Sequence, residues 1–410
     1  MAIELLSPAG NAEKLKTAFA YGADAAYMGL TNFSLRKNAG NFAENELEEV
    51  RRLKAETGKK LYCTMNIIFR EDQIEQLYAM KDEIAAWPFD AFIITDIGLV
   101  PFFQKYMPEK QLHLSTQASC INSASARMYM DMGFSRIILG REASLDDIKR
   151  MKDKNPELEL EAFAHGAMCM AYSGRCMLSA FLSGRSANQG DCAHTCRWNY
   201  RMHYALEEQE RPGIYYPIEE QDGYDTILSS KDLCMIDHVK DFEDAGLSSL
   251  KIEGRMKSVY YVAVTTRAYR KALDRDPDLD MYKKDIFNVS HREFTTGFFY
   301  SKGPIETVAD VERPTSYGYE RAYQFLGTVG RKIAEDTYLL EVKNQIRPRQ
   351  HLEFIGPDVP LLEDEKYMLL DEEGFPLLQA DHGKYCAIRT KLPLKEGYIM
   401  RRESEVKHVN

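Results

Sequence analysis

The chain has 410 residues, more than the roughly 250–300 at which one hydrophobic core stops growing, so a lone small module is excluded and two domains are expected. Hydrophobic residues make up 44% and charged residues 28%, which excludes a mostly disordered, collagen-like or coiled-coil protein. The formal net charge of −10 provides no bulk basic field, so any contact with nucleic acid must come from a local patch.

The first residues read MAIELLSPAGNAEKL and lack the basic start, apolar run and cleavage site of a secretory signal, so a cytoplasmic protein is expected. The most apolar stretch, residues 91–103, contains Asp96 and Gly98 and is shorter than the ~20 residues of a bilayer span. We therefore expect no membrane role. Because thiols stay reduced in the cytoplasm, the eight cysteines predict no disulfide framework.

Short strand-like runs alternate with amphipathic helical stretches from the start of the chain, which is typical of a parallel sheet with crossover helices. The predicted strands are Glu4–Ser7, Ala25–Gly29, Lys60–Asn66, Ala91–Thr95, Leu112–Thr116, Arg136–Gly140, Glu159–His165 and Ser249–Gly254. The predicted helices between them are Ala12–Tyr21, Glu44–Thr57, Gln73–Trp87, Ser123–Met132, Leu145–Lys154 and Ser258–Asp274. Eight such units in about 275 residues match an α/β fold of the (β/α)8 TIM-like barrel type, with a doubly wound open sheet as the alternative.

The connection between the seventh and eighth predicted strands takes about 85 residues, whereas most such connections take ~2–6 residues plus a helix. Residues 166–248 therefore form a long insert in a catalytic domain that spans residues 1–275, and this insert holds five of the eight cysteines. A connecting segment follows over residues 276–322. From 323 to 410, frequent short strands with turn residues between them predict a small C-terminal all-β barrel or sandwich.

The cysteines of the insert form a dense cluster interleaved with glycines, and packing alone does not require such a cluster. They are Cys169, Cys176, Cys192, Cys196 and Cys234. Zinc would use four Cys and His groups, with His165 and His194 available, whereas the wide spacing of the first pair suits an iron–sulfur cluster. Catalytic or redox thiols and buried inert thiols are the other interpretations. The three remaining cysteines, Cys63, Cys120 and Cys386, are predicted to be core residues.

Catalytic groups of a barrel of this type lie at the carboxyl ends of its strands. The polar residues at those ends are Asn66, Asp96, Gln117, Arg141, Glu142, His165, Lys251, Glu253 and Arg255. We predict catalytic roles for Arg141, His165, Glu253 and Arg255. Substrate-binding roles are predicted for Asn66, Asp96, Gln117 and Lys251, and for Arg185 in the insert. The alternative is that Asp96 and Glu253 only cap the following helices and that the two arginines are surface charges.

Four blocks of the sequence carry a family resemblance. They read LLSPAGNAEKLKTAFAYGADAAYMG, EAFAHGAMCMAYSGRCMLS, SSKDLCMIDHVKDFEDAGLSSLKIEGRMKS and VSHREFTTGFF. Together they resemble the collagenase-like peptidase family of unassigned catalytic type. For members with a C-terminal domain, the resemblance implies a tRNA hydroxylation protein that forms 5-hydroxyuridine at the wobble position, with prephenate as a required metabolite. It also implies an iron–sulfur cluster of the 4Fe–4S kind with ligands at Cys169, Cys176, Cys192 and Cys234, and with Cys196 as the alternative third ligand.

The family name leaves a peptidase that acts on unfolded polypeptide as the alternative function. The sequence has no HExxH helix and no GxSxG elbow, although His165 or His194 could serve a cysteine protease. A dicarboxylate such as prephenate needs cationic forks, and the candidates are Arg141, Arg175, Arg185 and Arg255.

Binding of tRNA would need a local basic surface with aromatic side chains for base stacking. The insert supplies Arg185, Arg197, Arg201, Trp198, Tyr200 and Tyr204, and the C-terminal domain supplies Arg331, Lys332, Lys343, Arg347 and Arg349. The alternative is a solvated charged face. The sequence also leaves room for a related partner subunit.

Overall fold

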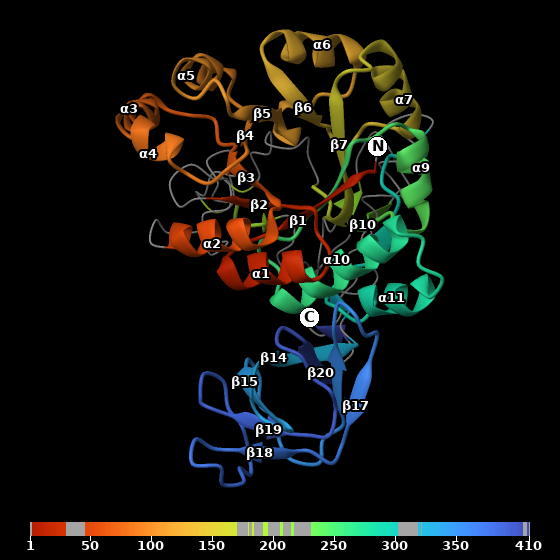
Figure 1. Cartoon of the computed structure of the whole chain (residues 1–410). Helices are drawn as coiled ribbons and strands as arrows, with labels where there is room; N and C mark the ends of the chain where they lie inside the picture. The colour runs from red at the N-terminus through yellow and green to blue at the C-terminus, as the bar shows by residue number, and fades with distance from the viewer. Residues whose placement is uncertain are drawn as a thin grey trace. The chain divides into compact units, whose positions relative to one another are not determined.

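The computed structural model describes residues 2–29, 46–169, 179, 183, 192–195, 206–207, 215–216, 231–301, 319–320, 322–404 and 408–409 (Figure 1). The chain divides into two compact units. The first comprises Met1–Ala12, Ala25–Met256 and Glu293–Ser316, and the second comprises Glu13–Asp24, Lys257–Arg292 and Tyr317–Asn410. Among the described residues, no helix combines the length and apolar character needed to cross a bilayer.

The first unit is built on a closed parallel barrel. Within the described residues its strands are β1 (Glu4–Pro8), β2 (Ala25–Gly29), β3 (Lys60–Met65), β4 (Ala91–Ile94), β5 (Gln111–Leu114), β6 (Phe134–Ile138), β7 (Glu159–Ala167) and β11 (Ser249–Ile252). Each strand pairs in parallel with the next, and β11 pairs with both β7 and β1, which closes the ring. The TIM-like barrel predicted from the sequence is confirmed, and the doubly wound open sheet is wrong because an open sheet leaves its edge strands unpaired.

Helices alternate with these strands along the chain. In the first unit they are α2 (Leu47–Thr57), α3 (Glu71–Ala79), α4 (Lys81–Ala85), α5 (Val100–Tyr106), α6 (Ser123–Asp131), α7 (Leu145–Lys154) and α9 (Val239–Asp244). Local capping fixes where α7 begins, because the Ser144 hydroxyl accepts from the Asp147 amide and the Asp147 carboxylate accepts from the Ser144 amide. The single helix predicted over Gln73–Trp87 is interrupted at Met80, whose ψ of 8° lies outside the helical range.

Part of the insert extends the barrel at β7. Strand β10 (Asp232–Cys234) runs antiparallel to β7, with Asp232 opposite Ala167 and Cys234 opposite His165. Strand β12 (Phe294–Thr295) then pairs in parallel with β10. A further short pair is formed by β8 (Leu206–Glu207) and β9 (Tyr215–Tyr216). The antiparallel pairing of β10 therefore places the last cysteine of the insert beside the carboxyl-terminal half of β7.

The second unit contains most of α1 (Ala12–Ala20), together with α10 (Val259–Leu273), α11 (Leu279–Ile286) and an antiparallel sheet. The sheet order is β17 (Leu362–Asp364), β16 (Leu352–Ile355), β20 (Ile399–Glu403), β14 (Tyr323–Ala334), β15 (Thr337–Val342), β19 (Ala387–Arg389) and β18 (Met368–Leu370). A small pair is formed by β13 (Tyr319–Glu320) and β21 (His408–Val409). The predicted all-β domain is confirmed. Its form is a half-barrel, because among the described residues no pairing joins the end strands β17 and β18.

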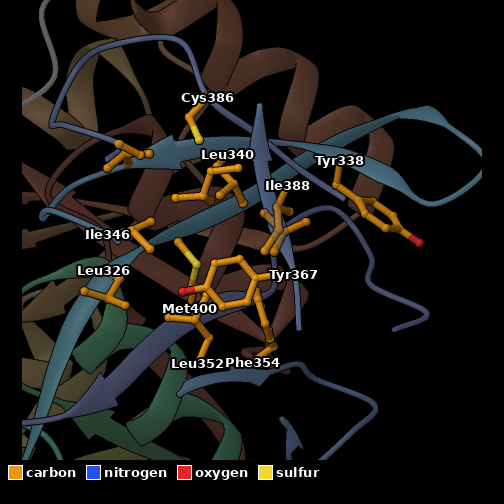
Figure 2. Packing of buried hydrophobic residues seen from close by; sticks show 14 of the residues in the cluster. Leu326, Tyr338, Leu340, Ile346, Leu352, Phe354, Tyr367, Cys386, Ile388 and Met400 are labelled. Atoms are coloured by element: carbon orange, nitrogen blue, oxygen red, sulfur yellow. The ribbon is translucent and has the colours of Figure 1, made fainter. Parts of the chain in front are cut away.

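One hydrophobic core holds the half-barrel together. Figure 2 shows the side chains of Leu340, Ile388 and Met400, from β15, β19 and β20, gathered in this core with Tyr367. Residues from non-neighbouring strands meet there, so the sheet must curve around the cluster. Burial of such apolar side chains is the main stabilising term for a sheet of short strands.

A buried ion network lies in the same unit. Asp285 on α11 accepts hydrogen bonds from Arg267 on α10 and from Arg401 on β20, the latter between Nη1 and Oδ1 at 2.6 Å. Arg401 also donates to Glu353 on β16 at 2.8 Å and to the Tyr260 hydroxyl at 3.1 Å. All five residues are buried. Asp285 thus joins two helices and the sheet through one carboxylate.

Candidate functional site at the carboxyl end of the barrel

Ionisable side chains cross the interior of the barrel. Arg136 on β6 donates from Nη1 to Glu4 Oε1 on β1 at 2.6 Å and to Glu161 Oε2 on β7 at 3.1 Å. The other oxygen of Glu161 accepts from Lys251 Nζ on β11 at 3.0 Å. Strands β6 and β1 are not neighbours in the strand order, so their contact runs through the inside of the barrel. Branched apolar residues usually fill this space.

These interior charges are deeply buried, with exposed fractions of 3% for the Arg136 side chain, 0% for Glu161 and 4% for Lys251. Buried charges are tolerated when they are paired and hydrogen-bonded, as they are here. His113 on β5 is also fully buried, and neither of its ring nitrogens has a hydrogen-bond partner among the described residues. Burial, together with the charges of Arg136, Lys251 and Lys60, holds the pKa of His113 well below its ordinary value, so this imidazole is neutral.

Three cations gather on two aromatic rings at the carboxyl end of the barrel, and we call Arg141, Lys251 and Arg255 the cation cluster. Arg141 Cζ lies 4.0 Å from the centre of the Phe163 ring. Lys251 Nζ lies 4.3 Å from the centre of the Tyr27 ring and 5.5 Å from that of Phe163. Arg255 Cζ lies 5.9 Å from the Tyr27 ring centre. Each ring therefore faces two cations, and the negative faces of the rings stabilise them.

Hydrogen bonds hold this cluster in place. Arg255 Nη1 donates to the Thr64 hydroxyl of β3 at 2.8 Å, and the Tyr27 hydroxyl donates to the Ile252 carbonyl at 2.9 Å. Arg141 Nη2 lies 3.9 Å from Glu253 Oε2. The cluster therefore has fixed cations with a carboxylate at one side, an arrangement suited to binding a small anion.

A glycine allows β7 to approach Glu253 closely. Gly166 has a φ of +111°, and a Cβ at this position would lie 2.6 Å from the Glu253 carbonyl oxygen. The Glu253 amide donates to the His165 carbonyl at 2.8 Å. His165 itself is buried, and its ring packs against Phe294 with 5.4 Å between ring centres. The His-Gly sequence after Ala164 therefore fixes the backbone that carries Glu253.

The predicted residues Asn66, Asp96 and Gln117 lie together on another part of the same end. The Thr95 hydroxyl donates to the Asn66 carbonyl at 3.2 Å and to Gln117 Oε1 at 3.1 Å. Asp96 accepts from the amides of Gly98 and Phe69, both at 3.0 Å, and so caps a short 3-10 turn. The capping alternative for Asp96 is thus the role that its carboxylate performs in this structure.

The cysteines fall into two groups. Cys63, Cys120 and Cys386 are buried, as predicted for core residues, and burial raises the pKa of the Cys120 thiol to about 11 and that of Cys386 to about 12. Cys169 is exposed just after β7, Cys234 is half-buried at the end of β10, and the half-buried Cys192 accepts from the His194 amide at 3.4 Å. Iron–sulfur clusters and many zinc sites are held by thiolates, and these three thiols, unlike the core cysteines, are accessible.

Several predicted residues lie outside the described residues, namely Cys176, Cys196, Arg175, Arg185, Arg197, Arg201, Trp198, Tyr200 and Tyr204. Of the basic residues predicted on the C-terminal domain, Arg331, Lys332, Arg347 and Arg349 are exposed. Lys343 instead forms ion pairs with Glu341 and Glu13 at 2.6 and 3.2 Å.

Residues in the middle of the barrel strands were not predicted to belong to the site. Tyr27, Phe163 and Glu161 all lie inside predicted strands, whereas the predicted site residues lie at strand ends. A usable signal is present in the sequence, because β1, β5, β6 and β7 each carry ionisable residues among apolar ones. In a barrel, alternate residues point inward, so such a pattern indicates a polar interior.

Comparison with known proteins gives a consistent result. The sequence profile described as "Peptidase family U32" matches residues 10–309, and that of the "Peptidase family U32 C-terminal domain" matches residues 321–401. The chain is 34% identical to tRNA hydroxylation protein P of Escherichia coli, with 86% of each chain covered. It is also 34% identical to tRNA hydroxylation protein P1 of Bacillus subtilis, over 92% of this chain and 89% of that protein.

A third relative is the 23S rRNA 5-hydroxycytidine C2501 synthase of Escherichia coli. It is 35% identical over 66% of this chain and 39% of its own length. The similarity therefore extends to a protein whose name records hydroxylation of a different RNA.

Proposed function

The chain belongs to peptidase family U32, and from that premise we propose that it is a tRNA-modifying enzyme that forms 5-hydroxyuridine at the wobble position. The observation that carries the proposal is the 34% identity to two tRNA hydroxylation proteins over 86% and 92% of the chain. This similarity spans the barrel and the C-terminal domain together. The relative named as a 5-hydroxycytidine synthase supports hydroxylation at the pyrimidine 5 position.

An iron–sulfur cluster with ligands Cys169, Cys176, Cys192 and Cys234 is the second part of the proposal. Three of these residues are described, and all three are at least partly accessible, in contrast to the buried core cysteines. Such a cluster, when bound, supplies electron-transfer chemistry that amino-acid side chains lack. The role of Cys234 is favoured by its place on β10, which the barrel strand β7 holds in register.

A small carboxylate such as prephenate is the proposed ligand of the cation cluster. Arg141 and Arg255 carry planar guanidinium groups that can bind carboxylates in a bidentate manner, and Lys251 adds a point charge. Arg255 is 4% exposed, so a bound anion would be largely shielded from water. In this position the cluster binds and orients the anion, while Tyr27 and Phe163 limit the space around it. A wobble uridine lies in a loop, so it can enter a pocket at low unstacking cost.

The decisive experiment is deletion of the gene in its host, followed by mass spectrometry of total tRNA nucleosides. We expect 5-hydroxyuridine and its derivatives to disappear from wobble positions and to return when the wild-type gene is supplied on a plasmid. Unchanged levels in a host with no paralogue would contradict the proposal. Cleavage of unfolded polypeptide by the colourless, metal-free protein would instead support the peptidase function.

Replacing Arg255 by Ala should weaken prephenate binding by roughly 30-fold or more. Loss of one fork leaves the anion partly unpaired in a desolvated site, at a cost of ~2–5 kcal/mol. Arg141→Ala should behave in the same way, whereas Arg150→Ala, on the exposed side of α7, serves as the control. Isothermal titration calorimetry with prephenate measures the effect. Wild-type affinity in both cluster variants would show that the anion binds elsewhere.

A further inference from the structure

We propose that Glu161 is a positioning residue whose carboxylate fixes the Lys251 ammonium against the Tyr27 and Phe163 rings. The inference deepens the proposed function and rests on it, since that function makes the cation cluster an anion site. Glu161 is not itself a member of the cluster and contacts it through Lys251.

Glu161 is held at both carboxylate oxygens. Oε2 accepts from Arg136 at 3.1 Å and Oε1 accepts from Lys251 at 3.0 Å. Arg136 is itself fixed by Glu4 at 2.6 Å and by Glu159 at 2.6 Å. With one oxygen on each cation, the carboxylate cannot turn without breaking a buried ion pair. Its geometry is therefore set by Arg136 on the neighbouring strand β6 as well as by Lys251 on β11.

Lys251 needs a partner such as Glu161 to fix the position of its ammonium. A lysine carries its point charge on a flexible four-carbon stem, so its position must come from its contacts. Among the described residues, the one carboxylate that forms an ion pair with Lys251 is Glu161. The ammonium is almost fully buried, and an unpaired charge there would be costly. Glu161 therefore both positions the Lys251 ammonium and compensates its charge.

Glu161 also affects the protonation of Lys251. Burial lowers the pKa of Lys251 below its ordinary value, the charge of Arg255 lowers it further, and Glu161 and Glu253 raise it. Removal of Glu161 takes away the strongest raising influence, so the pKa must fall further. Several titratable and charged groups surround the ammonium. They are Glu161 on β7, Glu253 and Arg255 after β11, Tyr27 on β2, Arg136 on β6, Arg141 after β6 and His113 on β5.

The direct test follows the titration of Lys251 by NMR in the full chain labelled with 13Cε-lysine. The Lys251 signal is identified by its absence in Lys251→Met. In Glu161→Gln we expect the titration midpoint to move to lower pH by about one unit or more. Glu159→Gln is the matched control, because it also removes a carboxylate from Arg136 but makes no contact with Lys251. An unchanged midpoint in Glu161→Gln would overturn the inference.

The activity test uses the pH profile of 5-hydroxyuridine formation. If a charged Lys251 is required, activity falls as pH rises through its pKa, so the alkaline limb should move to lower pH in Glu161→Gln. The double variant Glu161→Gln/Lys251→Met should lose no more activity than Lys251→Met alone. Additive losses together with a wild-type pH profile would assign Glu161 a purely structural role.

Two further arms keep the outcomes separate. If Glu161→Gln does not fold, Glu161→Asp is measured in its place. Its shorter side chain draws the carboxylate away from Lys251, so the Lys251 midpoint should move to lower pH than in the wild type. An unmoved midpoint in every variant overturns the inference. If the wild-type protein forms no 5-hydroxyuridine, the proposed function fails, whereas the NMR titration still decides the role of Glu161.

Discussion

Replacing Cys169, Cys176 or Cys234 by Ser is expected to abolish iron binding and, with it, formation of 5-hydroxyuridine. An iron–sulfur cluster is held by thiolates, and a serine hydroxyl, which stays protonated at neutral pH, is a poor substitute. Iron, acid-labile sulfide and visible absorption of the anaerobically purified chain measure the loss. For the third ligand we favour Cys192 over Cys196, and the two single variants decide between them.

The core cysteines provide the control for this experiment. Cys63→Ser and Cys386→Ser should retain iron in the folded fraction. Both thiols are buried, unlike the accessible thiols of Cys169, Cys192 and Cys234. Full iron retention in Cys169→Ser and Cys176→Ser would contradict the proposed ligand set. If the purified chain contains zinc and no acid-labile sulfide, the cysteines form a zinc site and not an iron–sulfur cluster.

Replacing Asp285 by Asn should lower the free energy of unfolding of the second unit by ~3–5 kcal/mol. The change leaves Arg267 and Arg401 buried with less compensating charge, at the point where α10, α11 and β20 meet. Hydrogen exchange followed by mass spectrometry, read on peptides from β16 and β20, measures the change locally. This readout is preferable to a global transition because the chain has two units.

Asp280→Asn is the matched control for Asp285→Asn. Asp280 lies on the same helix with its side chain 91% exposed, 3.7 Å from Lys283. Exposed ion pairs of this kind contribute little, so a change within about 0.5 kcal/mol is expected. Equal protection in the two variants would show that the buried network does not stabilise the sheet.

The strands of the barrel could be predicted because each is a short apolar run bounded by turn residues. Strand β17 was not predicted, because its residues Leu-Glu-Asp include a single apolar side chain and so carry no periodicity. Arg141, Lys251 and Arg255 were predicted as site residues from their positions at strand ends. Their grouping on Tyr27 and Phe163 required the barrel to close, since the contacts join strands that are distant in sequence.

Glu161 shows where sequence reasoning ends. A glutamate in the middle of a strand can face either solvent or the barrel interior, and only the register of β6, β7 and β11 places it between Arg136 and Lys251. For the cysteines, thiol chemistry and spacing in the sequence predict metal ligation, which stays a prediction. Spacing does not choose between zinc and an iron–sulfur cluster, because both accept thiolates at variable separations.

The pairing of β10 with β7 bears on how this protein family can diversify. Ala167 and Asp232 are directly opposite each other, so the segment between them leaves and rejoins the barrel at one point. The length of that segment is therefore not dictated by the spacing of the strands. Loop closure costs only about 0.6 kcal/mol more for each doubling of length. Residues can therefore be added to or removed from this segment, outside its proposed ligand cysteines, without displacing β7 or β10.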